Sequence, residues 1–171
     1  MKSKKNLVLL GMMGSGKSTI GNLVSKKLKT SFIDIDSLIE KLTKMKISDI
    51  FLKKGEKYFR DLEEKISIKS LNVNNNAVIS LGGGAFINEN IRAEVIKNNF
   101  PLWLHLDTPT LLSRIKKTKK RPIAFKLDDT ELAKLIENRT KIYSKATFKI
   151  NCYKLSKTEI VKKIIKLYEY S

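Results

Sequence analysis

The sequence has few residues of the kinds that build disulfide frameworks and protein-held metal centres. It contains one cysteine, Cys152, so an intramolecular disulfide is excluded, and one histidine, His105, with no cysteine near it to complete a zinc site. No apolar stretch approaches the ~20 residues that cross a bilayer. The basic start of the chain leads into a glycine-rich loop, where a signal peptide would need a cleavage site. We therefore expect a cytoplasmic protein that is neither exported nor inserted in a membrane.

Acidic residues are scarce relative to basic ones. The chain has 35 Lys and Arg against 17 Asp and Glu, a formal net charge of +18. Such a balance is compatible with nucleic acid, an anionic membrane surface or small anionic ligands as partners. The lysines are spread along the whole chain, and lysine, isoleucine and asparagine are all abundant, as translation of an AT-rich genome would produce. We interpret the charge as background composition and expect no nucleic-acid or membrane partner, with a basic nucleic-acid-binding ATPase as the alternative.

The hydrophobic pattern predicts one α/β domain over residues 1–171. A chain of 171 residues with 42% hydrophobic content can bury a substantial core. Short apolar runs predict strands, and apolar positions at helical spacing between them predict helices. Strands that alternate with helices form a mainly parallel sheet, here five-stranded and flanked by helices. The predicted strands are 6–10, 31–35, 77–81, 100–106 and 147–151, and the clearest predicted helices are 56–71, 88–98, 128–143 and 158–168.

The segment from Gly11 to Ser18 matches the phosphate-loop pattern G-x-x-x-x-G-K-[ST] between a predicted strand and a predicted helix. Its glycines let successive N–H groups turn toward phosphate oxygens at the positive end of a helix. Lys17 is expected to reach the β- and γ-phosphates of ATP, and the Ser18 hydroxyl to bind Mg²⁺. The alternative is a glycine-rich turn that only joins strand to helix. The residues assigned to ATP in this segment are Gly14, Ser15, Gly16, Lys17, Ser18 and Thr19, although Thr19 is equally compatible with packing at the helix start.

Two acids two positions apart, Asp34 and Asp36, close the second predicted strand. Side chains at this spacing on a strand point to the same side, and the carboxyl edge of a parallel sheet is where ligands bind. One carboxylate would hold a water of the magnesium shell, and the other would accept a hydrogen bond from an attacking hydroxyl. The alternative is that Asp36 caps the helix that follows.

The remaining motifs complete a pattern over nearly the whole chain that resembles the shikimate kinase family. They are Phe59-Arg60 with Glu63-Glu64, the segment Ser80-Leu81-Gly82-Gly83-Gly84-Ala85, Arg121-Pro122, and Arg139 with Tyr143. The resemblance implies a three-layer P-loop kinase fold. It also implies transfer of the γ-phosphate of ATP to the 3-hydroxyl of shikimate, giving shikimate 3-phosphate and ADP on the route to chorismate and the aromatic amino acids. We expect a monomer.

The resemblance also implies individual roles. Shikimate would be held within a segment of about residues 34–61 and by more distant residues, and a mobile lid of about residues 116–127 would close on ATP. By resemblance Lys17, Asp36 and Arg121 are catalytic. With Ser18, Asp34 and Ser80 would lie in the magnesium region, and Arg114 would stack on the adenine. The residues expected to hold the substrate are Asp36, Arg60, Gly82, Gly83, Gly84 and Arg139.

The chemistry of the residues agrees with an acidic substrate, because the planar fork of a guanidinium matches a carboxylate. Each assignment has an alternative: Arg60 as a solvated helix residue, Arg139 paired with Glu137 or a neighbouring acid, Arg114 facing solvent, and the three glycines as a flexible turn. The Ile-Ala-Phe sequence after Pro122 departs from the two leucines common in the family. Rival functions are a P-loop kinase for gluconate or nucleoside monophosphates, and a nucleotide-binding module without catalysis.

Overall fold

A computed structural model describes residues 5–72, 76–117 and 127–170, in which strands and helices alternate as the sequence predicts. All five predicted strands form, each within two residues of its expected bounds. The strands are β1 (Leu7–Leu10), β2 (Phe32–Asp34), β3 (Val78–Ser80), β4 (Phe100–His105) and β5 (Phe148–Asn151). The helices are α1 (Lys17–Leu28), α2 (Ile35–Thr43), α3 (Ile47–Leu71), α4 (Glu89–Asn98), α5 (Thr108–Lys116), α6 (Asp129–Tyr143) and α7 (Lys157–Glu169), with the short 3₁₀ helix η1 (Ala85–Ile87).

The sheet has the order β2-β3-β1-β4-β5, and every pairing between these strands is parallel. Strand β1 lies at the centre, with Leu7 opposite Val78 of β3 on one side and Phe100 of β4 on the other. Its four residues are at most 1% exposed, which explains why a continuous apolar run predicts this strand. After β1 the chain forms β2 and β3 on one side of this strand, and it then crosses to the other side to form β4 and β5. Such a reversal opens a crevice at the carboxyl ends of the strands, directly after β1.

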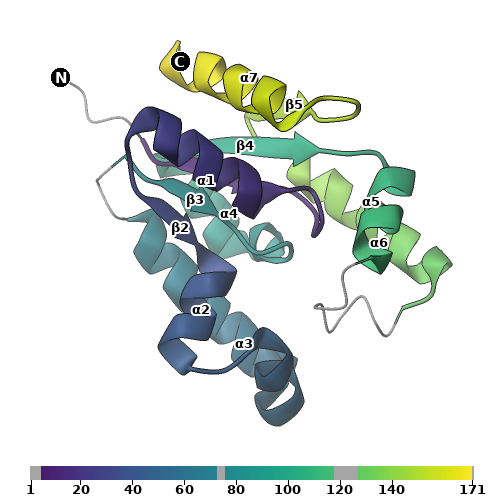
Figure 1. Ribbon diagram of the computed structural model, residues 1–171. Coiled ribbons are helices and arrows are strands. Elements are labelled where there is room, and N and C mark those ends of the chain that lie inside the picture. Colours follow the sequence, from purple (N-terminus) through teal and green to yellow (C-terminus); the bar gives the residue numbers. More distant parts are fainter. Residues whose placement is uncertain (1–4, 73–75, 118–126, 171) are drawn as a thin grey trace.

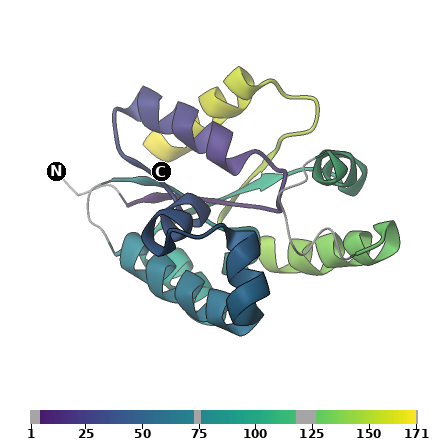
Figure 2. The same ribbon diagram turned by 60° about the horizontal axis from the view of Figure 1, so that its bottom comes forward.

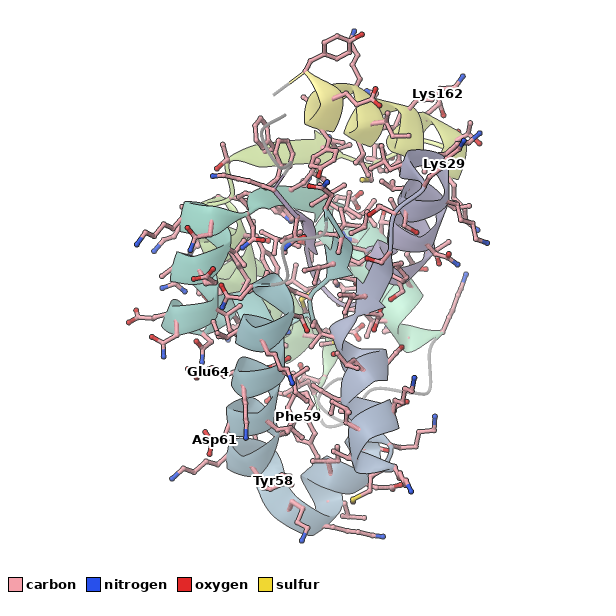
Figure 3. The ribbon with its side chains drawn as sticks, turned by 90° about the vertical axis from the view of Figure 1, so that its left-hand side faces the viewer. Lys29, Tyr58, Phe59, Asp61, Glu64 and Lys162 are labelled. Atoms are coloured by element: carbon pink, nitrogen blue, oxygen red, sulfur yellow. The ribbon has the colours of Figure 1, made fainter. Side chains whose placement is uncertain are left out.

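Helices cover both faces of the sheet and complete three layers, which confirms the predicted fold class. Helices α1 and α7 lie side by side on one face, and α3, α4 and α6 lie on the other (Figures 1 and 2). Lys29, at the end of α1, and Lys162, on α7, point outward from the first face (Figure 3). Within the described residues, none of the helices combines the length and the apolar character needed to cross a membrane.

Polar residues fix where several helices begin. Asp128 and Glu131 form a reciprocal capping box at the start of α6, and Ser156 and Glu159 form another at the start of α7. In such a box the side chain of each residue accepts a hydrogen bond from the backbone N–H of the other, which satisfies two donors that the first helical turn leaves free. These local signals explain why the sequence predicts the starts of α6 and α7 to within one residue.

Helices α2 and α3 form an arm that extends beyond the sheet (Figure 1). Gly55 interrupts α3 with φ 84° and ψ 168°, a conformation that glycine adopts without steric penalty, and the predicted helix 56–71 corresponds to the part of α3 after this break. Across the break the rings of Phe51 and Phe59 lie 4.7 Å apart between centroids. Phe59 is turned in toward α2, whereas Asp61 points away (Figure 3). The break therefore lets the two parts of α3 pack against each other and against α2.

Candidate active site at the carboxyl edge of the sheet

The loop between β1 and α1 has the conformation that phosphate binding requires. Gly11, Gly14 and Gly16 have φ values of 145°, 80° and 94°, in a region that strains any residue with a Cβ. The loop leads directly into α1, whose first N–H groups lack helical partners and carry the positive end of the helix dipole. This geometry favours the phosphate-loop interpretation over a turn that only joins two elements.

Lys17 is buried within this loop, where its ammonium group donates hydrogen bonds to the loop's own carbonyls. Nζ lies 2.8 Å from the carbonyl oxygen of Gly11 and 3.1 Å from that of Met12. A lysine ammonium has three donors on a flexible stem, so it can move toward phosphate oxygens without a change in the fold. Lys17 also lines a hollow at this edge of the sheet. The full lining is Gly14, Gly16, Lys17, Ser18, Thr19, Asp34, Asp36, Ser80 and Leu81.

Two oxygen donors suited to Mg²⁺ meet on one side of the hollow. The Ser18 hydroxyl donates to Oδ2 of Asp34 across 2.5 Å, which joins the start of α1 to the end of β2. The backbone N–H of Ser37 donates to Oδ1 of the same carboxylate across 3.0 Å. Mg²⁺ prefers hard oxygen ligands and is held by few protein groups when phosphates supply the others. A hydroxyl and a carboxylate at this distance fit that requirement.

The position of Asp36 corrects the expectation that both acids lie on one strand. Strand β2 ends at Asp34, and Asp36 lies in the first turn of α2. The cap of α2 is Asp34, so the alternative that Asp36 caps this helix is also wrong. Both carboxylates nevertheless line the hollow, because the chain turns into α2 at the edge of the sheet. The first turn of α2 brings the two carboxylates together, whereas the sequence predicted that two alternate positions of one strand would do so.

The three consecutive glycines after β3 provide space for their neighbours. None of them has a φ in the left-handed region, so a side chain is excluded by contact and not by backbone conformation. A Cβ on Gly82 would lie 2.8 Å from Oδ1 of Asp36, and one on Gly84 would lie 2.7 Å from Nη1 of Arg60. A Cβ on Gly83 would lie 3.1 Å from the backbone nitrogen of Met13 in the phosphate loop. The segment thus packs between the phosphate loop, α2 and α3.

Arg60 is held by carboxylates of its own helix. Its Nη1 lies 2.6 Å from Oε2 of Glu63, and its Nη2 lies 3.4 Å from Oε1 of Glu56. Burial raises the pKa of the Glu63 carboxyl, and the adjacent Arg60 guanidinium opposes that shift. The guanidinium is partly covered and contacts Gly84, so the alternative of a freely solvated Arg60 is wrong.

Arg139 reaches the same region from α6 and is 6% exposed. Its Nη1 donates to the carbonyl oxygen of Gly83 across 3.2 Å and contacts Sδ of Met12 at 3.8 Å. Burial is the largest cause that lowers the pKa of Arg139, and the like charge of Arg60 lowers it further. The alternative pairing with Glu137 is wrong, because that carboxylate pairs with Lys141 at 3.4 Å. Among the described residues, Nε of Arg139 is buried without a hydrogen-bond acceptor.

The other residues expected to bind ATP are Thr19, Arg114 and Arg121, and the structure describes the first two. Thr19 is exposed and lines the hollow beside Ser18. Arg114 is exposed on α5 and lies against the phosphate loop, with Nη1 3.3 Å from the carbonyl oxygen of Gly14. Arg121 and most of the expected lid, 118–126, lie outside the described residues.

Sequence reasoning did not assign functional contacts to three residues that the fold brings into this region. Glu63 holds Arg60, and its position three residues further along a helix is a signal that could have revealed the pair. The Tyr143 hydroxyl donates to the carbonyl oxygen of Gly83, and Met12 contacts Arg139. The contact of Tyr143 spans 60 positions in the sequence and that of Met12 spans 127. No local pattern in the sequence predicts either of them.

The family model and the relatives with substantial sequence identity agree on one family. The model of the family described as "Shikimate kinase" matches residues 13–169. A shikimate kinase of Sulfurihydrogenibium sp. is 41% identical over 161 residues, which cover 94% of this chain and 96% of that protein. The solved shikimate kinase of Acinetobacter baumannii in complex with shikimate has a TM-score of 0.89 at 28% identity, covering 97% of this chain and 93% of that one. The solved enzyme of Aquifex aeolicus has a TM-score of 0.84 at 38% identity, covering 96% of each chain.

Proposed function

Because the chain belongs to the shikimate kinase family, and is therefore a kinase, we propose that it transfers the γ-phosphate of ATP to the 3-hydroxyl of shikimate. The products are shikimate 3-phosphate and ADP. The observation that carries the proposal is the position of two guanidinium groups beside the phosphate loop. Arg60 contacts Gly84 and Arg139 donates to Gly83, while Gly83 itself lies against Met13.

The environment of Arg139 favours a small anionic ligand. A buried guanidinium whose Nε lacks an acceptor in the described part of the chain carries an uncompensated desolvation cost. A carboxylate would satisfy that donor and would offset the positive charge that Arg139 and Arg60 bring close together. We therefore assign the carboxylate of shikimate to Arg60 and Arg139, with the ring against Gly82, Gly83 and Gly84.

Asp36 is assigned to the reacting hydroxyl. It lines the hollow beside the phosphate loop and lies against Gly82, which supports a role for its carboxylate between the two proposed ligands. In the reaction the hydroxyl oxygen forms a bond to the γ-phosphorus, the bond from that phosphorus to the bridging oxygen of ADP breaks, and the hydroxyl proton passes to Asp36. An aspartate in this position also orients the hydroxyl for in-line attack.

Lys17 and the oxygen pair of Ser18 and Asp34 are assigned to the phosphate side. Lys17 would leave the carbonyls of Gly11 and Met12 to contact the β- and γ-phosphates, where its charge offsets the negative charge of the transferring group. Ser18 and Asp34 would hold Mg²⁺, which neutralises phosphate charge when it is bound with ATP. In this proposal Gly14, Ser15, Gly16, Thr19 and Arg114 complete the ATP site, and Arg121, which lies outside the described residues, is assigned to the same nucleotide.

The test is ADP release with shikimate, gluconate and nucleoside monophosphates assayed side by side with ATP and Mg²⁺. We expect turnover that depends on shikimate and exceeds the rate with the other acceptors by orders of magnitude. Equal or faster turnover with another acceptor would contradict the proposed substrate. The same preparation gives two further checks: we expect a monomer by light scattering, and no RNA or DNA binding that strengthens steeply as salt falls.

A further inference from the structure

We propose that Tyr143 is a positioning residue for the substrate arginine, acting through the carbonyl group of Gly83. The inference rests on the proposed function and extends it to a residue that binds neither ATP nor the acid in that proposal. Tyr143 ends α6 one helical turn after Arg139, so both side chains project from the same side of this helix. Both donate to one acceptor, the carbonyl oxygen of Gly83, which lies in the loop between β3 and η1.

The shared carbonyl fixes the direction in which Arg139 presents its remaining donors. A carbonyl oxygen has two lone pairs, and here Tyr143 and Nη1 of Arg139 occupy them. With Nη1 committed to Gly83 and Met12, the plane of the guanidinium is set, and Nε is left for a ligand. If the carbonyl moved, the guanidinium of Arg139 would lose the hydrogen bond that sets its orientation.

Tyr143 is rigid enough to hold that carbonyl in place. Its side chain is 1% exposed, and its ring packs against Phe86 and Trp103 with centroid distances of 6.4 and 6.0 Å. Trp103 lies on β4, so the ring ties α6 to the sheet as well as to η1. A buried aromatic ring confined on two sides has few alternative rotamers, and its hydroxyl is therefore held at one location.

The carbonyl that Tyr143 holds lies in a segment with little other means of support. Gly83 has no side chain to pack, and its neighbours must leave room for Asp36 and Arg60. The segment continues into η1 through a hydrogen bond from the N–H of Ala85 to the carbonyl of Gly82, at 3.1 Å. Glycine loses more conformational freedom on ordering than any other residue, so three in succession gain most from an external anchor. Tyr143 supplies that anchor.

The test compares Tyr143→Phe with a matched control, Tyr168→Phe. Tyr168 is also buried, and its hydroxyl also donates to a backbone carbonyl, that of Lys5, which lies at the opposite end of β1 from the phosphate loop. Each substitution removes one buried hydroxyl and keeps the ring. A hydrogen bond between neutral groups corresponds to a factor of roughly two to ten in an equilibrium constant. Both variants should therefore fold and lose a similar, small amount of thermal stability.

We expect only Tyr143→Phe to raise the KM for shikimate, by roughly three- to tenfold, with the KM for ATP unchanged. In the ligand-free protein, amide hydrogen exchange over residues 82–87 should be faster in Tyr143→Phe than in the parent and unchanged in Tyr168→Phe. In a double-mutant cycle with Arg139→Lys, the two effects on shikimate KM should be smaller in combination than their sum, because Tyr143 acts through Arg139.

An unchanged shikimate KM in Tyr143→Phe, an equal rise in the KM for ATP, or additive effects in the cycle would each overturn the inference. So would exchange over 82–87 as slow as in the parent. A parent enzyme that fails to turn over shikimate would contradict the proposed function instead, and the exchange measurement on ligand-free protein would still decide whether Tyr143 holds this segment.

Discussion

Nη1 of Arg60 lies 2.6 Å from Oε2 of Glu63, and the two side chains differ sharply in exposure: 29% for the arginine and 3% for the glutamate. The carboxylate is thus buried behind the guanidinium, at one edge of the triple-glycine segment, where a Cβ on Gly82 would lie 2.6 Å from Oε1 of Glu63. An ion pair with one buried member resists solvent screening better than a surface pair, so it can orient Arg60 toward a ligand.

Replacing Glu63 with glutamine should change how stability depends on pH. Burial raises the pKa of Glu63 above its unfolded value, so between these two values the folded protein binds more protons than the unfolded chain. The contribution of Glu63 to stability therefore falls as pH rises through the window just above the usual glutamate pKa. Urea unfolding of the parent and Glu63→Gln at several pH values measures this, and the difference in free energy of unfolding between them should change across that window. A difference that is independent of pH would contradict the raised pKa.

Replacing Lys17 with methionine should abolish turnover while the fold survives. The ammonium group of Lys17 donates to the loop carbonyls of Gly11 and Met12, and methionine largely preserves the aliphatic stem, which is the part of the side chain that packs. Because its proposed role is to offset charge in the transition state, the loss should appear in kcat as well as in ATP binding. ADP release measures turnover, and circular dichroism checks the fold. Turnover near the parent rate would contradict the phosphate-loop assignment.

Replacing Asp36 with asparagine should lower kcat by roughly 10²–10⁴-fold, the usual contribution of a positioned general base. The KM for ATP should change little. Asp61→Asn is the matched control, because Asp61 is exposed on α3 and points away from the arm (Figure 3). Steady-state ADP release measures both variants. A loss in Asp36→Asn below about threefold would mean that its carboxylate does not take part in proton transfer.

Replacing either Arg60 or Arg139 with lysine should raise the KM for shikimate by roughly tenfold or more, because the charge remains and the two-pronged geometry is lost. The KM for ATP should move little. A shikimate analogue without the carboxylate serves as the control: it should be a poor substrate of the parent and should respond much less to either substitution. If the variants lose ATP affinity and keep normal shikimate affinity, both arginines belong to the nucleotide site.

Replacing Gly84 with alanine should impair the substrate side through a steric contact. The φ of Gly84 is −109°, which alanine adopts readily, so the backbone is not strained. The added Cβ would lie 2.7 Å from Nη1 of Arg60 and must displace it. We expect kcat/KM for shikimate to fall about tenfold, because small misplacements of binding groups carry large rate penalties. Gly16→Ala, at φ 94°, should instead impair ATP binding. Parent-like kinetics in Gly84→Ala would show that Arg60 can relocate without loss.

The sequence by itself determined the parts of this protein that depend on neighbours along the chain. The phosphate loop can be predicted from the sequence because its function needs glycines, a lysine and a hydroxyl residue at fixed spacing within one turn. The central strand β1 can be predicted from the sequence because burial on both faces demands a continuous apolar run. The break at Gly55 and the starts of α6 and α7 follow from the backbone preferences of single residues and from local caps.

Tertiary structure decided which of these elements meet and how. The strand-to-helix boundary at Asp34 was misjudged because a short apolar run does not show whether the next residues continue a strand or begin a helix. The pair of Arg60 and Glu63 could have been found from its helical spacing. The convergence of Arg139, Tyr143 and Met12 around Gly83 could not. Those contacts arise from the packing of α6 against loops at the edge of the sheet, and packing depends on shapes that distant segments acquire only when the chain has folded.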